Sequence, residues 1–304
     1  MLIFRELTEA PRPTAVALGY FDGVHLGHKS VIRAAVECKS EGLTPVVFTF
    51  SSTPKRGTEK LQLTSFEEKA RIFEQIGVEI LYIIDFETVR NKTPEEFVSG
   101  VLKKVFKAEK VFCGYNYHFG KNGTATGEDL VKICESHGVK AFIKKPVRFR
   151  NDYVSSTKIR GYLKSGDIEK ANKMLGYDFG IVSESVEGRH LGTAMNTPTI
   201  NLNFETNRII PRYGVYASTV FVDGERHIGV TNIGVKPTVS EGSTPNCETW
   251  MPLYKGGELY NKRVEVRLRE FLRPEKKFKS LEELRQAIRY DGETAVKILK
   301  SKGE

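Results

Sequence analysis

The sequence lacks several features that would assign it to a special class of protein. Its four cysteines are scattered, with no Cys-x-x-Cys pair among Cys38, Cys113, Cys134 and Cys247. This usage argues against a structural zinc site and for a reducing cytoplasm, where disulfides are rare. No apolar stretch approaches the length of a membrane span, and residues 1–6 lack the basic start of a signal peptide. We therefore expect a cytoplasmic protein that has no membrane partner.

The chain also lacks an internal repeat, a low-complexity linker and a concentrated charge of one sign. Its 304 residues include 47 Lys and Arg against 38 Asp and Glu, which gives a net charge of +9. Because the basic residues are spread out beside acids, they are typical of a solvated surface. The sequence has no basic stripe with interleaved aromatics, so we expect no nucleic-acid partner. A positive field would also suit substrates made of phosphates.

The first half of the sequence alternates strand and helix patterns. Buried strands are predicted at residues 15–18, 46–50, 80–84, 110–113 and 139–143. Helix starts with a capping box are predicted at Ser65 with Glu68 and at Thr93 with Glu96. Apolar residues 97, 101 and 105 then fall on one helix face. This alternation predicts an α/β fold with a doubly wound parallel sheet.

The pattern changes near Gly176 to short alternating strands separated by turn residues. Asp223-Gly224 between two such runs predicts a hairpin, and the whole region predicts an antiparallel barrel or sandwich. A final helix is predicted from a capping box of Ser280 and Glu283. Its predicted apolar face comprises residues 281, 284, 288, 295 and 299. We expect two domains, residues 1–176 and 177–304.

The most informative motif, Gly-Tyr-Phe-Asp-Gly-Val-His-Leu-Gly-His at residues 19–28, follows the first strand. A strand, a Gly-rich turn and a helix N-terminus offer backbone N–H groups and a positive dipole end to an anion. Two imidazoles add donors, and a glycine lets a nucleotide come close. Plain turn formers and surface histidines are the simpler interpretation. The position after the first strand favours a nucleoside-triphosphate site that transfers an AMP group. The candidate residues are Gly19, Phe21, Asp22, Gly23, His25, Gly27 and His28.

An aromatic-rich loop at residues 114–121 follows a later strand directly. Its aromatics could stack on a flat ring, and Asn116 could bind a ligand or phosphate through hydrogen bonds. A loop that packs on itself explains the composition equally well.

Three hydroxyls and two cations open the next predicted helix, at residues 155–160. An ordinary N-cap with surface charges is the commoner arrangement. The alternative is a phosphate clamp, in which Ser155, Ser156, Thr157 and helix amides hold oxygens. Arg160 would then neutralise charge as pyrophosphate leaves.

Three polar residues of the second half are candidates for a second site. Thr199 and Asn201 are two residues apart, so in a strand they point to the same face. A hydroxyl and an amide there could hold Mg²⁺ and a phosphate, or be exposed polar residues of an edge strand. Glu248 lies within an apolar strand pattern and is either solvent-facing or a general base for a hydroxyl. The sequence does not determine which face of the strand Glu248 occupies.

Taken together and in order, these motifs resemble those of the bacterial bifunctional riboflavin kinase/FAD synthetase family over nearly the whole chain. The first half resembles an FMN adenylyltransferase of the nucleotidyltransferase superfamily, which has a Rossmann-like fold. The second half resembles a riboflavin kinase, a six-stranded barrel with a terminal helix, and carries Pro198-Thr199-Ile200-Asn201 where the family has its Pro-Thr-Ala-Asn signature. The other segments that match lie at residues 19–28, 114–120, 155–160, 232–238, 259–260 and 272–278.

The resemblance implies two ATP-dependent reactions. In the barrel, Glu248 would deprotonate the ribityl 5′-hydroxyl of riboflavin, which attacks the γ-phosphate of ATP. Thr199 and Asn201 would hold Mg²⁺ and the phosphates. In the first half, the FMN phosphate would attack the α-phosphate of a second ATP and release pyrophosphate. The departing charge would be stabilised by His25, His28, Ser156, Thr157 and Arg160, while Asn116 would help to hold the reacting phosphates.

The implied partners are small molecules: ATP, riboflavin, FMN, FAD and pyrophosphate, with Mg²⁺ as cofactor. For the oligomeric state, we expect a monomer or a weak homo-oligomer. One alternative is a single-activity FMN adenylyltransferase with a weak or inactive kinase module, suggested by Met195-Asn196-Thr197 before Thr199. Another is a basic nucleic-acid-binding or flavin-sensing regulator, and a third is an adenylyl- or cytidylyltransferase with a different acceptor.

Overall fold

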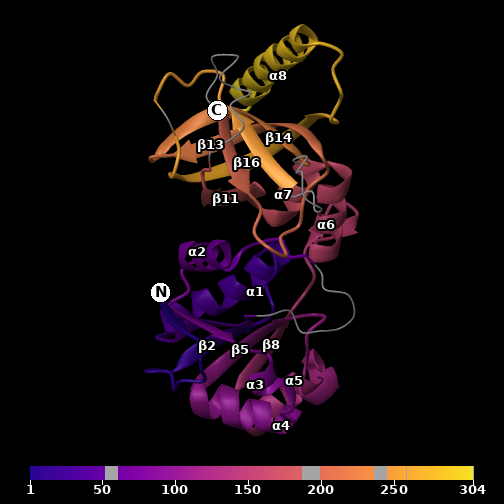
Figure 1. The fold of residues 1–304 in the computed structure, drawn as a ribbon. Coiled ribbons are helices and arrows are strands. Elements are labelled where there is room, and N and C mark those ends of the chain that lie inside the picture. The colour runs from indigo at the N-terminus through magenta and orange to yellow at the C-terminus, as the bar shows by residue number, and fades with distance from the viewer. Residues whose placement is uncertain (52–60, 187–198, 236–244, 258, 304) are drawn as a thin grey trace. The chain divides into compact units, whose positions relative to one another are not determined.

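The computed structural model describes residues 1–51, 61–186, 199–235, 245–257 and 259–303. The chain forms two compact units, Met1–Ser156 and Thr157–Glu304 (Figure 1). Each unit is built around its own sheet and is described separately.

A six-stranded sheet forms the centre of the first unit. Its strands lie in the order β1 (Leu2–Phe4), β4 (Ile80–Ile84), β3 (Thr44–Phe50), β2 (Thr14–Leu18), β5 (Ala108–Gly114) and β8 (Lys140–Lys144). Every neighbouring pair is parallel, which confirms the predicted doubly wound sheet. The edge strand β1 was not predicted, because an apolar run of only three residues is too short to indicate a strand.

Helices cover both faces of this sheet (Figure 1). Ala15 and Ala17 of β2 pack in one core with α1 and α2, whereas Val16 and Leu18 pack in the other with residues of the remaining helices. Successive residues of β2 therefore face the helix layers on opposite sides of the sheet. This explains why the whole strand is apolar, since both of its faces are buried. The helices are α1 (Leu26–Glu37), α2 (Phe66–Ile76), α3 (Glu87–Arg90), α4 (Pro94–Glu96), the π-helix η2 (Phe97–Val105) and α5 (Gly127–Ser136), with 3₁₀ turns η1 (Cys38–Glu41) and η3 (Lys121–Gly123).

The predicted capping boxes of this unit are both present. The Ser65 side chain accepts from the Glu68 amide, and the Glu68 carboxylate accepts from the Ser65 amide. Thr93 and Glu96 make the same reciprocal pair. Two small hairpins follow, β6 (His118–Phe119) with β7 (Ala125–Thr126), and β9 (Arg148–Phe149) with β10 (Asp152–Tyr153).

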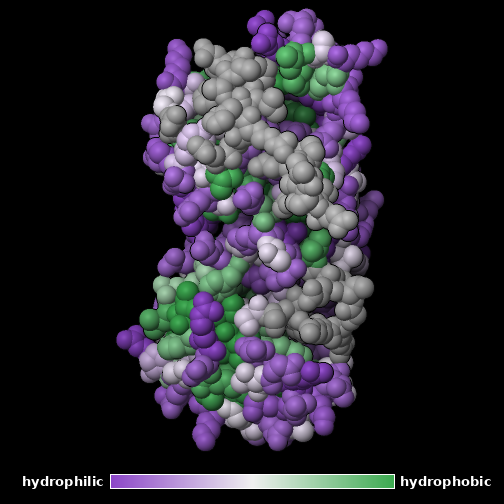
Figure 2. All heavy atoms as spheres, viewed as in Figure 1, coloured by the Kyte–Doolittle hydropathy of each residue, from purple (hydrophilic) through white to green (hydrophobic). Residues whose placement is uncertain are grey.

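Both units expose large apolar side chains on their surfaces. On the face drawn in Figure 2, hydrophobic residues gather mainly over the first unit. That unit exposes 56% of Leu2 and 44% of Ile3 on its edge strand. All four cysteines are buried and free. Within the described ranges, no helix has both the length and the apolar character needed to cross a membrane.

The second unit is a nearly closed antiparallel barrel preceded by two helices, α6 (Ser156–Ser165) and α7 (Ile168–Leu175). The strands lie in the order β11 (Gly180–Glu184), β16 (Arg263–Arg273), β13 (Gly214–Val222), β14 (Glu225–Val235), β15 (Pro245–Trp250) and β12 (Thr199–Asn203). A bridge between Val186 and Asn201 brings the two ends of the sheet together. Asp223 and Gly224 join β13 to β14 with positive φ values of 53° and 81°, which confirms the predicted hairpin.

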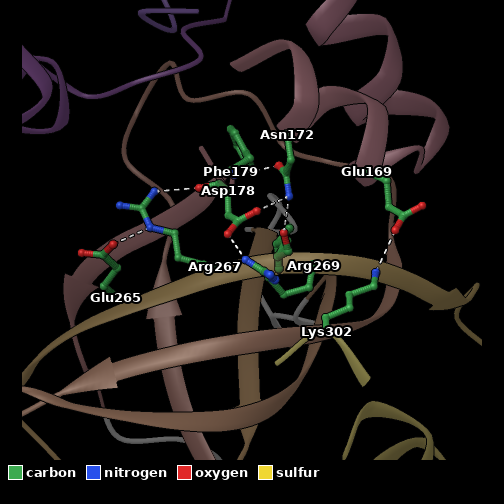
Figure 3. Close-up of polar contacts among 9 residues, drawn as sticks. Glu169, Asn172, Asp178, Phe179, Glu265, Arg267, Arg269 and Lys302 are labelled. Carbon is green, nitrogen blue, oxygen red and sulfur yellow. Dashed lines mark hydrogen bonds and ion pairs between the residues drawn. The ribbon is translucent and has the colours of Figure 1, made fainter. Parts of the chain in front are cut away.

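Polar contacts fasten α7 and the chain end to strand β16 (Figure 3). The Asn172 amide donates to the Asp178 carboxylate and to the Leu268 carbonyl, and it accepts from the Phe179 amide. Lys302, just beyond the last helix, donates to Glu169 at 2.7 Å and also contacts β16. The helical connector thus packs as part of the barrel unit.

The terminal helix α8 (Leu281–Ser301) covers the outer face of the barrel through Ala295 and Leu299. The predicted apolar face is wrong at its start, because 69% of Leu281 is exposed where the helix leaves the sheet. The predicted capping box is half correct. Ser280 accepts from the Glu283 amide, but the Glu283 carboxylate accepts from the Lys279 amide instead of from Ser280.

Candidate active sites

The nucleotide-binding motif of residues 19–28 lies at the point where the strand order of the first sheet reverses. From β2 the chain proceeds to β3 and β4 on one side, whereas β5 and β8 lie on the other. Residues 19–28 leave the carboxyl end of β2, and the loop of residues 114–121 leaves the carboxyl end of its neighbour β5. Open α/β sheets bind ligands at this position.

The backbone of the turn between β2 and α1 is strained. Phe21, Gly23 and Val24 have positive φ values of 53°, 82° and 33°. Such a conformation is unusual for a β-branched residue and persists only where the surroundings impose it. Gly19 is required by the same turn, since a Cβ atom there would lie 2.8 Å from the Phe21 ring.

The two histidines of the motif form one stacked pair at the start of α1. His25 is the N-cap, and its Nδ1 accepts from the His28 amide at 3.2 Å. The neutral His25 ring therefore carries its proton on Nε2, which becomes a donor. The ring centroids are 3.5 Å apart. The His28 Nδ1 is buried and has no hydrogen-bond partner among the described residues.

Burial keeps both histidines uncharged near neutral pH. Desolvation lowers the pKa of His25 to about 4. Desolvation also holds the pKa of His28 well below its ordinary range, and the neighbouring His25 and Lys69 act in the same direction. The pair can therefore contribute neutral hydrogen-bond donors and a helix terminus to an anion, rather than positive charge.

Two predicted residues of the turn have structural partners within the unit. The Asp22 Oδ1 accepts a hydrogen bond from the Leu63 amide at 2.8 Å, and the backbone carbonyl of Asp22 accepts one from the Ser156 hydroxyl at 2.9 Å. This hydrogen bond places the Ser156 side chain beside the turn. A Cβ atom on Gly27 would lie 3.1 Å from the His25 ring, so Gly27 makes room for that ring.

The remaining candidates of the first reaction occupy two segments. Asn116 is exposed in the loop after β5, where Tyr117 stacks on Phe119 at 5.9 Å, so the loop packs on itself in part. Ser155 is half-buried directly before α6. Thr157 is exposed and Arg160 half-buried in the first turns of that helix, within the second unit.

A second group of candidates lies on the outer face of the barrel. Asn201 of β12 is directly opposite Glu248 of β15, and Glu248 is directly opposite Asn232 of β14. Because cross-strand partners point to the same face, these three side chains form one row. Thr199, two residues before Asn201, belongs to the same face and pairs with Trp250. This is the face on which α8 packs, since Trp250 belongs to the core under that helix.

Hydrogen bonding in this row leaves polar atoms for a ligand. Asn201 is only 2% exposed, and its Oδ1 accepts from the Asn246 Nδ2 at 3.2 Å. Within the described part of the chain, Asn201 Nδ2 and Asn246 Oδ1 are buried without hydrogen-bond partners. A buried donor without a partner is costly, so a phosphate oxygen would suit Asn201 Nδ2.

Two residues of this face were not among the predicted site residues. Asn232 occupies the row itself, and its alternation with buried Ile233 was the signal that could have identified it. A Cβ atom on Gly234 would lie 2.1 Å from the Glu275 Oε1, so the glycine lets this carboxylate rest against β14. Glu275 lies in the segment of residues 272–278 that resembles the family, but its place beside β14 depends on the path of the chain after β16.

Several motif residues lie outside the described ranges. They comprise residues 195–198 and 236–238, which include Pro198 and the segment directly before Thr199. Among the described residues, no cluster of three or more His, Cys, Asp or Glu side chains could hold a metal ion.

Both halves of the chain match known families. The FAD synthetase family profile matches residues 7–158, and the riboflavin kinase profile matches residues 175–299. A bifunctional riboflavin kinase/FMN adenylyltransferase of Listeria monocytogenes is 33% identical over 88% of this chain and 87% of its own. The Bacillus subtilis enzyme of the same name is 31% identical over 96% and 94%, respectively.

Solved structures include a close match to the fold. A Streptococcus pneumoniae structure described as a macrolide-efflux protein superposes with a TM-score of 0.88 at 27% identity, and the match covers 97% of this chain and 98% of that one. Its whole length therefore corresponds to the two units of this chain.

Proposed function

This chain belongs to the family of bifunctional riboflavin kinase/FMN adenylyltransferases, and from that premise we propose that it makes FAD in two ATP-dependent steps. The observation that carries the proposal is the pairing of β12 with β15, which sets Glu248 opposite Asn201 on one face of the barrel. We propose a functional division into residues 1–176 and 177–304, close to residue 175, where the match to the riboflavin kinase profile begins; the compact units divide earlier, after Ser156.

In the first step, riboflavin is phosphorylated on the barrel. Glu248 accepts the proton of the ribityl 5′-hydroxyl, whose oxygen attacks the γ-phosphorus of ATP, and the bond to the β-phosphate oxygen breaks to give FMN and ADP. Asn201 Nδ2 donates to a phosphate oxygen. Positioning and neutralisation of charge provide most of the catalysis in such transfers.

The donor set of this face fits Mg²⁺. The Thr199 hydroxyl and the Asn201 Oδ1 are hard oxygen ligands two residues apart on the same face of β12. Mg²⁺ is commonly held by one or two protein groups together with substrate phosphates, where it neutralises their charge. We assign Thr199 and Asn201 as the residues that would hold it.

In the second step, FMN is adenylylated at the strained turn of the first unit. The FMN phosphate attacks the α-phosphorus of a second ATP, and the bond to the β-phosphate oxygen breaks to release pyrophosphate. The nucleophile is already anionic, so no strong base is needed. His25 Nε2 and the first amides of α1 donate to the departing group.

Other residues complete this second site in the proposal. Ser155, Ser156 and Thr157 at the start of α6 would hold phosphate oxygens, and Arg160 would neutralise the charge that builds up on pyrophosphate. His28 supports His25 through the stacked pair, and Asn116 would help to hold the reacting phosphates. The turn of Gly19, Phe21, Asp22, Gly23 and Gly27 shapes the nucleotide site.

We also propose a cytoplasmic location and a monomer or weak homo-oligomer that has small-molecule partners only. Four buried, free cysteines support a reducing compartment.

Separate incubations of the purified protein with riboflavin and with FMN, each with ATP and Mg²⁺, test the function by chromatography of the products. The proposal predicts FMN and FAD from riboflavin, and FAD and pyrophosphate from FMN. FAD from FMN with riboflavin unchanged would restrict the activity to FMN adenylylation. No conversion of either flavin would refute both steps.

A further inference from the structure

The strained nucleotide turn contacts Leu63 and Thr64, which directly precede the N-cap of α2 and to which neither reaction assigns a role. The Leu63 amide donates to Asp22, and the Gly23 amide donates to the Thr64 hydroxyl at 3.1 Å. Both contacts join positions 41 residues apart in the sequence. The capping box of Ser65 fixes where α2 begins, directly after these two contacts.

A buried lysine of the same helix forms the third contact with the turn. Lys69 is 4% exposed, and its Nζ lies 3.4 Å from the Tyr20 carbonyl oxygen and 4.4 Å from the centroid of the Tyr20 ring. Lysine is almost never buried without a strong partner. Burial lowers the pKa of Lys69, whereas the nearby Asp22 carboxylate opposes that shift.

These contacts give little stability in return for the burial of a charge. A long hydrogen bond to a carbonyl, a ring contact and the attraction of the Asp22 carboxylate offset only part of the cost of desolvating the ammonium group, because burial remains the larger influence on the pKa of Lys69. Where a local arrangement is unfavourable for folding, a functional requirement is the usual reason. The functional requirement here is to keep Phe21, Gly23 and Val24 in their positive-φ conformation, which persists only where surrounding contacts hold it.

We propose that Lys69 and Thr64 are positioning residues for adenylyl transfer. They hold Tyr20 and Gly23 so that His25 and the start of α1 keep the geometry that meets the departing pyrophosphate. Neither residue touches the reacting atoms in this role. The inference rests on the proposed FMN adenylyltransferase activity of the first unit.

The principal test is Lys69→Met in the full chain, measured by steady-state FAD formation from FMN and by thermal unfolding. Methionine has similar length and no charge to desolvate. A positioning role predicts that kcat and kcat/KM both fall by about tenfold to a hundredfold, because misplacement by about 1 Å has effects of this size. The apparent midpoint of unfolding should remain equal to or above that of the wild type.

Thr64→Val provides an independent variant, because it removes the acceptor of the Gly23 amide with little change in volume. Its matched control is Thr14→Val. Thr14 is fully buried at the opposite end of β2 and donates to the Phe106 carbonyl at 2.6 Å. The control should lower the unfolding midpoint while kcat stays within twofold of the wild type. Thr64→Val should lower kcat at least tenfold.

Riboflavin phosphorylation by the same preparations serves as an internal control and should not change. The inference is overturned if Lys69→Met and Thr64→Val keep kcat within twofold of the Thr14→Val protein. It is also overturned if their loss of activity follows a loss of folded protein. A wild-type protein that makes no FAD from FMN would instead overturn the proposed function, and the inference with it.

Discussion

The replacement Glu248→Gln tests the assignment of the kinase base most directly. Glu248 stands in a row between Asn201 and Asn232, and glutamine keeps the shape of the side chain while it removes the proton acceptor. A positioned general base contributes about a hundredfold to ten-thousandfold to a rate. We therefore expect kcat for riboflavin phosphorylation to fall by that factor, which corresponds to about 2.7–5.4 kcal/mol at about 1.36 kcal/mol per tenfold.

Folding should hardly respond to this change. Glu248 is half-buried on the outer face, and surface substitutions of this kind usually alter stability by no more than about 0.5 kcal/mol. The assay measures FMN from riboflavin, with FAD from FMN as an internal control and Glu225→Gln, an exposed carboxylate of β14, as the matched variant. A Glu248→Gln protein that phosphorylates riboflavin within threefold of the Glu225→Gln protein would refute the reasoning.

Three further predictions concern close contacts and protonation. Gly292→Ala would place a Cβ atom 2.6 Å from the rigid Trp250 ring. Although alanine favours helix, we expect the free energy of unfolding in urea to fall by about 1–3 kcal/mol, and an unchanged midpoint would contradict this packing. Gly234→Ala would displace the Glu275 carboxylate, because an added Cβ atom would lie 2.1 Å from its oxygen. We expect slower riboflavin phosphorylation at nearly unchanged stability, and a rate equal to that of the wild type would exclude a role for that carboxylate. Burial lowers the pKa of His25 from 6.5 to about 4, so the unfolded state binds more protons than the folded state between these pH values. The unfolding temperature of the first unit should therefore fall as the pH falls from 6.5 towards 4. In a His25→Gln protein the unfolding temperature should fall less steeply over the same range.

Local elements of the fold were predictable because their signals are local. Residues 80–84 were predicted as a strand and form β4 as Ile80–Ile84, since an apolar run between turns suffices to indicate a buried strand. The spacing of Phe97 and Val101 correctly predicted their burial, although the segment is a π-helix rather than an α-helix. Leu281 was misassigned because the apolar pattern of a helix does not show where the surface beneath it ends.

The candidate sites were predictable where a motif is continuous and hidden where the fold assembles distant segments. His25 and His28 belong to one turn of chain, so their proximity follows from spacing alone. The support of that turn by Lys69 does not, because the contact depends on how α2 packs. The role of Gly27 also needed the structure, which shows a histidine ring against its Cα.

The outward direction of Glu248 depends on strand register, which the interior of the barrel specifies. A shift of one residue in β15 would turn Glu248 inward and its neighbour Thr249 outward. The buried hydroxyl of Thr231 contacts Ser218 at 2.7 Å and Thr249 at 2.9 Å, so a chain of hydroxyls crosses β13, β14 and β15 on the inner face. A slipped register in β15 would remove Thr249 from the Thr231 hydroxyl and would place the Glu248 carboxylate inside the barrel, where a buried charge without a partner is costly. The polar ladder inside the barrel therefore selects the register that presents Asn201, Glu248 and Asn232 together on the outside.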